Sequence, residues 1–512
     1  MKKSTRAGAL TAVCAIAASA LTGCADAGGG SGAKGSTTLN LATLTLPQSL
    51  DPADANGSAL PFFQAVYDTL IKREPNGSFS PMLATEWKYN GDRTELTLTL
   101  RDGVKFDDGT PLDATAVKAN MERFAKRTGA QAKTLKDVKS IQVVDKTHVT
   151  LKLSQPNPAM LYFLSDAAGL MANPASFGKP GDPLKTKPDG TGPYELDSAK
   201  SAIGTRWVYT RARNYWGTRL PYENITITYF NNETAIVNGL RTRQLNAALL
   251  QTADQQVAAE SDRKLTTVPQ EFDFQGIVLF DRGGALVPAL RDARVRQALN
   301  HALDRKTMLS KIRQGRGAVT DQIFGTQAAG YVKELDAHYA HDPAKARELL
   351  KQAGHASGFT LKLPRVSAIV SDALASSIQT DLAAIGVKVT WENVDAGAIR
   401  KIFTDRGFPA MVMNLGQPAD DWIGISDYVL PGVFNMFGTT DDTVRELLPK
   451  IQRAPAGEAK TELQALNRHL VEQAWFVPFY RLSYLHVTDG SVKVTPQSGM
   501  AVPSVYNYAP AK

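Results

Sequence analysis

The chain has 512 residues, 43% of them hydrophobic, and a formal net charge of +8. This length is enough for two or three domains with sizeable cores. Basic residues alternate with Asp and Glu rather than forming runs, which favours a mixed solvated surface over a nucleic-acid-binding face. The two cysteines are Cys14 and Cys24. The body that follows them therefore has neither a disulfide nor a cysteine-based metal site.

The start of the sequence has the features of an export signal followed by a tether. Three basic residues precede an alanine-rich stretch at 7–20, which is too short for a permanent membrane span. The stretch leads into Leu-Thr-Gly-Cys24, which resembles the bacterial lipobox. We expect a signal peptide at 1–23, a lipid on Cys24 whose two acyl chains suffice for anchoring, and a flexible glycine-rich tether at 24–38. The alternative is an ordinary cleaved signal with a chance cysteine.

The first half of the body combines predicted strands with helices. A strand is expected at 39–44 and a helix at 62–71. Apolar residues alternate with polar ones at 94–101, which is the period of a half-buried strand. Asp113 is placed to cap a helix that extends to Arg127 and carries its apolar residues on one face.

The second half has the pattern of an α/β lobe. Hydrophobic periodicity and capping residues predict five elements: a helix at 295–303, a helix from Asp342-Pro343 to Gly354, a strand at 360–363, a helix at 371–384 and a strand at 386–391. The strand–helix–strand order indicates α/β structure. The whole pattern predicts a mixed α/β or α+β protein with several lobes.

Nine sequence blocks follow one another along the chain: 50–52, 81–87, 100–112, 190–194, 214–217, 292–303, 342–346, 384–389 and 475–480. In this order they resemble the peptide/nickel class of extracellular solute-binding proteins, the dipeptide- and oligopeptide-binding family. Many of their residues also have a structural reading. Gly103 and Gly109 supply backbone freedom at turns, and Trp216 and Trp475 are expected in the core.

The resemblance implies a periplasmic-binding-protein-like fold with two lobes, a hinge and an extra inserted domain. Lobe I would be discontinuous, at 39–61, 190–269 and 482–512. The inserted domain would span 62–189, and lobe II 270–481. Ligand would sit between the lobes and favour their closure.

The resemblance also implies a ligand site. In family members that bind peptides, an Asp in this region pairs with the peptide's α-ammonium, and Asp420 matches that Asp, with Asp421 as the rival register. Such a pair adds about 1.5–3 kcal/mol in a desolvated cleft. Trp422 is a candidate wall of the cleft and Asn435 a candidate contact. Gln417 replaces an aromatic residue common in the family, which favours an unusual ligand. The alternative is that Asp420 only accepts hydrogen bonds from nearby backbone amides.

The expected role is that of a monomeric lipoprotein, anchored outside the cytoplasmic membrane, that delivers a peptide or peptide-like solute to the permease and ATPase subunits of an ABC importer. No cofactor, metal or nucleic acid is expected. Two alternatives keep the same fold: a ligand-presenting sensor, and an importer component for a sugar, an opine or a metal chelate. An exported hydrolase is disfavoured because no nucleophile–base pair is recognisable in the sequence.

Overall fold

The computed structural model describes residues 37–127, 131–455 and 457–511. The predicted signal peptide and Cys24 lie outside the described residues. Within those ranges, no helix has both the length and the apolar character needed to cross a membrane.

A nine-stranded mixed sheet links the regions predicted as the two lobes. Its strands are ordered β16-β12-β17-β11-β1-β10-β9-β8, with β13 paired to β17. Their bounds are β1 Thr38–Thr43, β8 Tyr194–Leu196, β9 Arg206–Arg211, β10 Asn224–Tyr229, β11 Ala247–Leu250, β12 Thr266–Leu279, β13 Gly317–Val319, β16 Ala410–Gly416 and β17 Phe476–Thr488. The predicted first strand is confirmed, and it pairs in parallel with β10.

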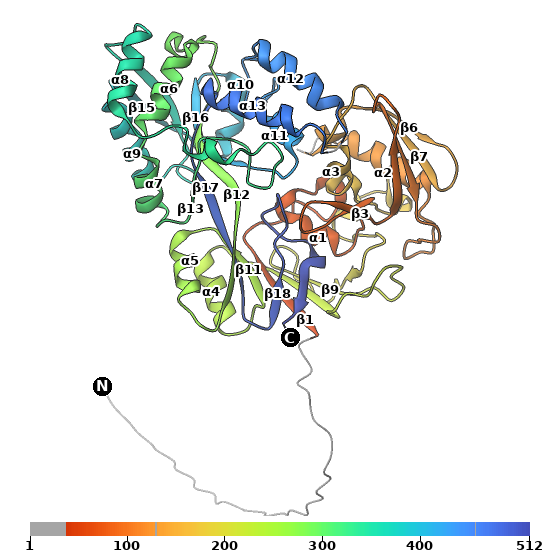
Figure 1. Ribbon diagram of the computed structural model, residues 1–512. Coiled ribbons are helices and arrows are strands. Elements are labelled where there is room, and N and C mark those ends of the chain that lie inside the picture. The colour runs from red at the N-terminus through yellow and green to blue at the C-terminus, as the bar shows by residue number, and fades with distance from the viewer. Residues whose placement is uncertain (1–36, 128–130, 456, 512) are drawn as a thin grey trace, which may run out of the picture. The chain divides into compact units, whose positions relative to one another are not determined.

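Strands β12 and β17 are the two long members of this sheet. They pair antiparallel from Thr266 opposite Thr488 to Val278 opposite Phe476. In Figure 1 they run from the region that holds α6 (Ala293–Ala302) and α13 (Lys460–Glu472) to the region that holds β11, α4 (Glu233–Arg241) and α5 (Ala253–Glu260). Their register shifts twice, once between Glu271 and Asp273. Such irregularities bend a strand and increase its twist.

A separate antiparallel sheet and one long helix occupy the region predicted as the inserted domain. The sheet is ordered β4 (Ala84–Tyr89), β5 (Glu95–Leu100), β7 (His148–Leu153) and β6 (Val138–Val143). Helix α2 (Ala114–Ala125) begins as predicted, because Asp113 accepts hydrogen bonds from the backbone amides of Thr115 and Ala116. A small hairpin, β2 (Ile71–Arg73) with β3 (Phe79–Pro81), and helix α3 (Met160–Leu164) complete this region.

The predicted helix at 62–71 is wrong. Helix α1 spans only Leu60–Gln64, and β2 already begins at Ile71. The backbone between them pairs with distant segments instead. The carbonyls of Ala65 and Val66 accept hydrogen bonds from the amides of Tyr194 and Gly192, respectively. Long-range pairing therefore overrides the local helical pattern.

Helices surround strands in the region predicted as lobe II. They are α6 Ala293–Ala302, α7 Arg305–Ile312, α8 Pro343–Gln352, α9 Asp372–Ala383, α10 Ile399–Asp405, α11 Asp421–Tyr428, α12 Asp442–Arg453 and α13 Lys460–Glu472. Strands β14 (Phe359–Arg365) and β15 (Val387–Asn393) are parallel and joined through α9, as predicted. Elsewhere, α4 is Glu233–Arg241, α5 Ala253–Glu260, β18 Val492–Val494 and β19 Tyr508–Pro510. The mixed α/β class is confirmed.

Trp475 lies in the core as expected, whereas Trp216 is only partly buried and packs against the core. Trp475 is 1% exposed and stacks with the guanidinium of Arg282. Trp216 donates its indole N–H to the buried carboxylate of Asp68, at 2.8 Å. That carboxylate also accepts hydrogen bonds from Thr191 and Tyr506, so it joins the chain's middle and its last segment.

Candidate functional site

A polar pocket of about 360 Å³ lies against the two long strands of the central sheet. Segments from both predicted lobes and from the inserted region meet around it. The lining residues are Pro75, Asn76, Pro269, Gln270, Glu271, Gly325, Thr326, Gln327, Gln417, Arg481, Pro496, Ser498 and Gly499. A concave polar site between lobes suits a small polar solute.

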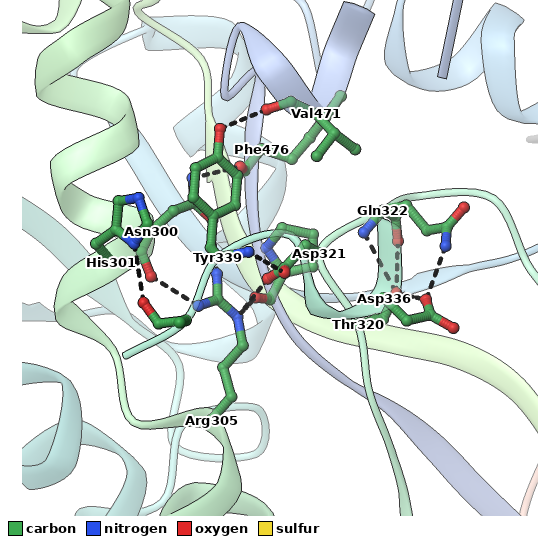
Figure 2. Close-up of polar contacts among 12 residues, drawn as sticks. Asn300, His301, Arg305, Thr320, Asp321, Gln322, Asp336, Tyr339, Val471 and Phe476 are labelled. Carbon is green, nitrogen blue, oxygen red and sulfur yellow. Dashed lines mark hydrogen bonds and ion pairs between the residues drawn. The ribbon is translucent and has the colours of Figure 1, made fainter. Parts of the chain in front are cut away.

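Arg481 is the buried cation of this pocket, and the fold holds it in place. Its guanidinium donates to both carboxylate oxygens of Asp336, at 3.0 and 2.6 Å, and to the Thr320 hydroxyl at 3.0 Å. Figure 2 shows that Asp336 also receives hydrogen bonds from Thr320 and Gln322. Burial alone would raise the pKa of Asp336, but the bonds from Arg481 bring it below its usual value. The pair is therefore charged and mutually compensated.

A second buried ion pair supports the same part of the protein. Arg305 lies 2.9 Å from the carboxylate of Asp321, and both side chains are almost fully buried. The same guanidinium donates to the carbonyl and side-chain oxygens of Asn300 and to the carbonyl of Pro478 in β17 (Figure 2). This network fixes α6 and α7 against β17.

Ala419, which directly precedes the predicted ligand residue Asp420, contacts the segments around Gly77 and Gly499. A Cβ added to Gly499 would lie 2.7 Å from the backbone nitrogen of Ala419, and one added to Gly77 would lie 3.7 Å from its Cβ. Gly499 also has a φ of +68°, which favours glycine. Bare backbone at Gly499 therefore allows this close approach, whereas a Cβ at Gly77 would make only an ordinary van der Waals contact.

Asp420 immediately follows this contact and caps helix α11. Its Oδ1 accepts hydrogen bonds from the backbone amides of Trp422, at 3.0 Å, and Ile423, at 3.3 Å. No hydrogen bond from the described residues reaches its Oδ2. Burial raises the pKa of Asp420 to about 6, the neighbouring Asp421 adds to the rise, and the cap bonds and the charge of Arg73 oppose it. Asp420 does not line the pocket described above, but lies beyond the Ala419 contact.

Asp421 uses both of its carboxylate oxygens within the protein. They accept hydrogen bonds from the backbone amides of Ala329, at 3.0 Å, and Gly330, at 2.7 Å. The side chain thus fastens the start of α11 to the loop that carries Thr326 and Gln327 of the pocket. Burial raises the pKa of Asp421 to about 6 as well.

The other two predicted contacts lie in packed surroundings. Trp422 is 6% exposed and belongs to the hydrophobic core beneath α11. Asn435 is fully buried: its side-chain amide donates to the carbonyls of Val429 and Thr439 and accepts from the Thr439 amide. The structure thus brings Asp420, Asp421 and Trp422 together on one helix start, with Asn435 in the loop that follows α11. Their roles toward a ligand stay predictions.

Sequence reasoning did not single out the residues that face Asp420 or line the pocket from other segments. Arg73 lies hundreds of positions from Arg481 and Ser498, and no motif connects it to them. The available signal was weak: Arg481 directly follows the family's closing block at 475–480. Within the described residues, no cluster of three or more His, Cys, Asp or Glu side chains suitable for a metal ion is found.

Comparison with known proteins identifies the family. The family model of the bacterial extracellular solute-binding proteins, family 5 (middle), matches residues 78–430. The chain belongs to this family. The glutathione-binding protein GsiB of Escherichia coli strain K12 is 28% identical over 361 residues, 68% of either chain. This result confirms the predicted recognition and the extracellular solute-binding role.

Solved structures of similar fold include two proteins with different ligands. The first is the ABC-transporter-associated periplasmic binding protein DppA from Helicobacter pylori, in complex with the peptide STSA. It has a TM-score of 0.76 at 21% identity, with 93% of this chain and 99% of that chain covered. The second is NikA from Brucella suis, in complex with Fe(III)-EDTA, with a TM-score of 0.76 at 23% identity, covering 92% and 99%. These likenesses confirm the two-lobed periplasmic-binding-protein fold.

Proposed function

We propose that this family 5 protein captures a peptide or peptide-like solute with a free amine between its lobes, and that Asp420 receives the ligand's ammonium. The observation that carries the proposal is that Oδ2 of Asp420 accepts no hydrogen bond from the described residues, next to the Ala419 contact. Oδ1 is occupied by the helix cap. Because the cap holds the carboxylate in a fixed orientation, an ammonium at Oδ2 finds its acceptor preorganised. The names of GsiB and the DppA complex, which refer to glutathione and a peptide, support a ligand of this class.

Closure is proposed to occur about β12 and β17. The predicted limits between lobe I and lobe II, 269/270 and 481/482, fall inside these two strands. The register shift between Glu271 and Asp273 lies beside the first limit. A ligand that contacts both sides binds the closed state better than the open one, so it shifts the population toward the state that a permease recognises.

The test of the amine contact is calorimetry with alanylalanine and N-acetyl-alanylalanine. Asp420→Asn keeps a good helix cap and removes the charge. We expect it to weaken alanylalanine binding at least about tenfold, the equivalent of one charge-assisted hydrogen bond. Acetylation should cause a similar loss in the unaltered protein. Asp427→Asn is the matched control, because this exposed carboxylate on the same helix pairs only with Lys133 among the described residues. Equal affinities in Asp420→Asn and the unaltered protein would refute the assignment.

Anchoring is proposed to occur through a lipid on Cys24. The support is the Leu-Thr-Gly-Cys24 sequence after a short apolar stretch. Cys24→Ser should release the protein from membranes into the soluble fraction. Continued membrane retention of the serine variant would contradict the lipid anchor.

Import, rather than sensing, is proposed as the outcome of binding. Deleting the gene should abolish uptake of a labelled ligand at low concentration. Undiminished uptake combined with a lost transcriptional response would favour the ligand-presenting sensor instead.

A further inference from the structure

Arg73 is a buried cation with unused hydrogen-bonding capacity. Its side chain is 3% exposed, at the end of β2. Nη2 lies 3.3 Å from the carboxylate of Asp166 and contacts Sδ of Met500, while the guanidinium stacks 3.9 Å above the ring of Tyr162. Nε and Nη1 are buried and donate no hydrogen bond of acceptable geometry to the described residues. Buried guanidinium N–H groups without acceptors are energetically costly, so such groups call for a ligand or a structural explanation.

The backbone places Arg73 opposite Asp420. The strand that ends at Arg73 leads into the turn whose Gly77 approaches Ala419. On the other flank, Met500 contacts Arg73 while its neighbour Gly499 is against the Ala419 backbone. Arg73 and Asp420 thus lie on opposite sides of the contact at Ala419. No direct ion pair joins them in the described structure, although the charge of Arg73 lowers the pKa of the Asp420 carboxyl.

Further unpartnered polar atoms lie nearby. The Ser498 hydroxyl, next to Gly499, is buried and has no hydrogen-bond partner in the described residues. The Tyr89 hydroxyl is likewise buried and has no hydrogen-bond partner in the described residues. Burial raises the pKa of Tyr89 to about 12, and the charge of Asp420 contributes to the rise. These donors come from the inserted region and from lobe I, on the side of the Ala419 contact opposite Asp420. Together with the Asp420 carboxylate they are complementary to a small ligand with charges of both signs.

We propose that Arg73 binds the carboxylate of an α-amino-acid head group whose ammonium is held by Asp420. This inference rests on the proposed function of Asp420. In an α-amino-acid head, both charges share one carbon, as they do in a γ-glutamyl peptide. In an ordinary α-peptide, each further residue separates the two termini by about 3.5 Å of chain. Two opposite charges that meet across a single backbone contact suit the first geometry.

Arg73 and Asp420 together select a class of ligand. The protein prefers solutes that present a free ammonium and a free carboxylate on the same carbon, with the remainder of the molecule extending toward the polar pocket beside Ser498 and Gly499. Asp166 keeps part of the Arg73 charge compensated when the site is empty, and Tyr162 holds the guanidinium plane. A planar guanidinium is well matched to a carboxylate.

Two isomeric probes test the ligand class without any mutation. γ-Glutamylglycine and α-glutamylglycine have the same atoms and the same charges, but only the γ isomer has an α-amino-acid head. We expect the purified full chain to bind the γ isomer at least about tenfold more tightly in calorimetry. Converting the α-carboxylate of γ-glutamylglycine to an amide should remove the preference. Equal binding of the isomers, or binding of neither, overturns the proposal.

Variants identify the residue responsible. Arg73→Gln should weaken binding of γ-glutamylglycine at least about tenfold and change the affinity for α-glutamylglycine less than about twofold. Arg73→Lys should have an intermediate effect on the affinity for γ-glutamylglycine. Arg101→Gln is the matched control, since Arg101 also stacks on an aromatic ring, that of Trp216, and donates to a backbone carbonyl. An undiminished γ preference in Arg73→Gln overturns the role of Arg73. If Asp420→Asn binds both isomers as the unaltered protein does, the proposed function itself has failed. If Asp420→Asn weakens binding of both isomers but Arg73→Gln keeps the γ preference, only the role of Arg73 is overturned and the proposed function stands.

Discussion

Asp421 is predicted to stabilise the fold rather than to bind ligand, although it stands next to Asp420. Asp421→Ala leaves the backbone amides of Ala329 and Gly330 without their acceptors, which lie at 3.0 and 2.7 Å. Each lost bond costs about 1–2 kcal/mol. Removing a buried charge offsets part of this loss, because burial raises the pKa of Asp421 to about 6. We expect the free energy of unfolding to fall by about 1–3 kcal/mol at pH 7.

The pH dependence of this variant follows from the same carboxyl. Its pKa in the folded state lies above the ordinary value, so the stability it contributes is fully present below the unfolded pKa and is lost as the pH rises through about 6. The deficit of Asp421→Ala should therefore be larger at pH 5 than at pH 7. Urea unfolding followed by circular dichroism measures it, with Asp427→Asn as the control that changes an exposed carboxylate of the same helix. Unaltered stability together with lost affinity for alanylalanine would refute this reasoning and make Asp421 the ligand carboxylate.

Three further predictions concern packing, closure and pH. Arg305→Met should lower the free energy of unfolding by about 3–5 kcal/mol, because it leaves Asp321 buried without its cation. In the same urea titration, the double variant Arg305→Met/Asp321→Asn should recover part of the lost stability. Gly499→Ala should weaken ligand binding, since its Cβ would collide with the Ala419 backbone, and should also lower the free energy of unfolding by about 1–2 kcal/mol because of its positive φ. Small-angle scattering should show a more open protein at saturating alanylalanine, and an unchanged profile and affinity would contradict this. Affinity for alanylalanine should fall as the pH drops below about 6, because only the ionised carboxylate of Asp420 pairs with an ammonium. In Asp420→Asn, calorimetry between pH 5 and 7 should show no such fall in affinity.

Local signals predicted those parts of the fold in which neighbouring residues determine the structure. Asp113 and Asp342 cap helices that begin where the sequence indicated, since a cap needs only backbone amides two or three residues away. The unit β14–α9–β15 was likewise readable from periodicity and its flanking turns. The failed helix at 62–71 shows the limit. Its backbone is taken by the strand and turn around Gly192 and Tyr194, more than a hundred residues away.

The candidate site was predictable on one side of the cleft only. Asp420 stands in a segment that resembles a family motif, and its place at the start of a helix is local information. Arg73 carries no such mark, because it ends a three-residue strand in a charged stretch. Its importance arises from burial against Tyr162 and Met500, which come from other parts of the chain. Only the folded backbone shows that Arg73 lies on the other side of the Ala419 contact from Asp420.

Mass spectrometry of the small molecules released on denaturing the purified protein tests the central claim most directly. We expect a solute with a free amine, recovered from the unaltered protein and from Asp427→Asn, and reduced or absent in Asp420→Asn. Recovery of a solute that lacks an amine, such as a sugar or a metal chelate, would contradict the account. So would undiminished recovery of the same amine from Asp420→Asn.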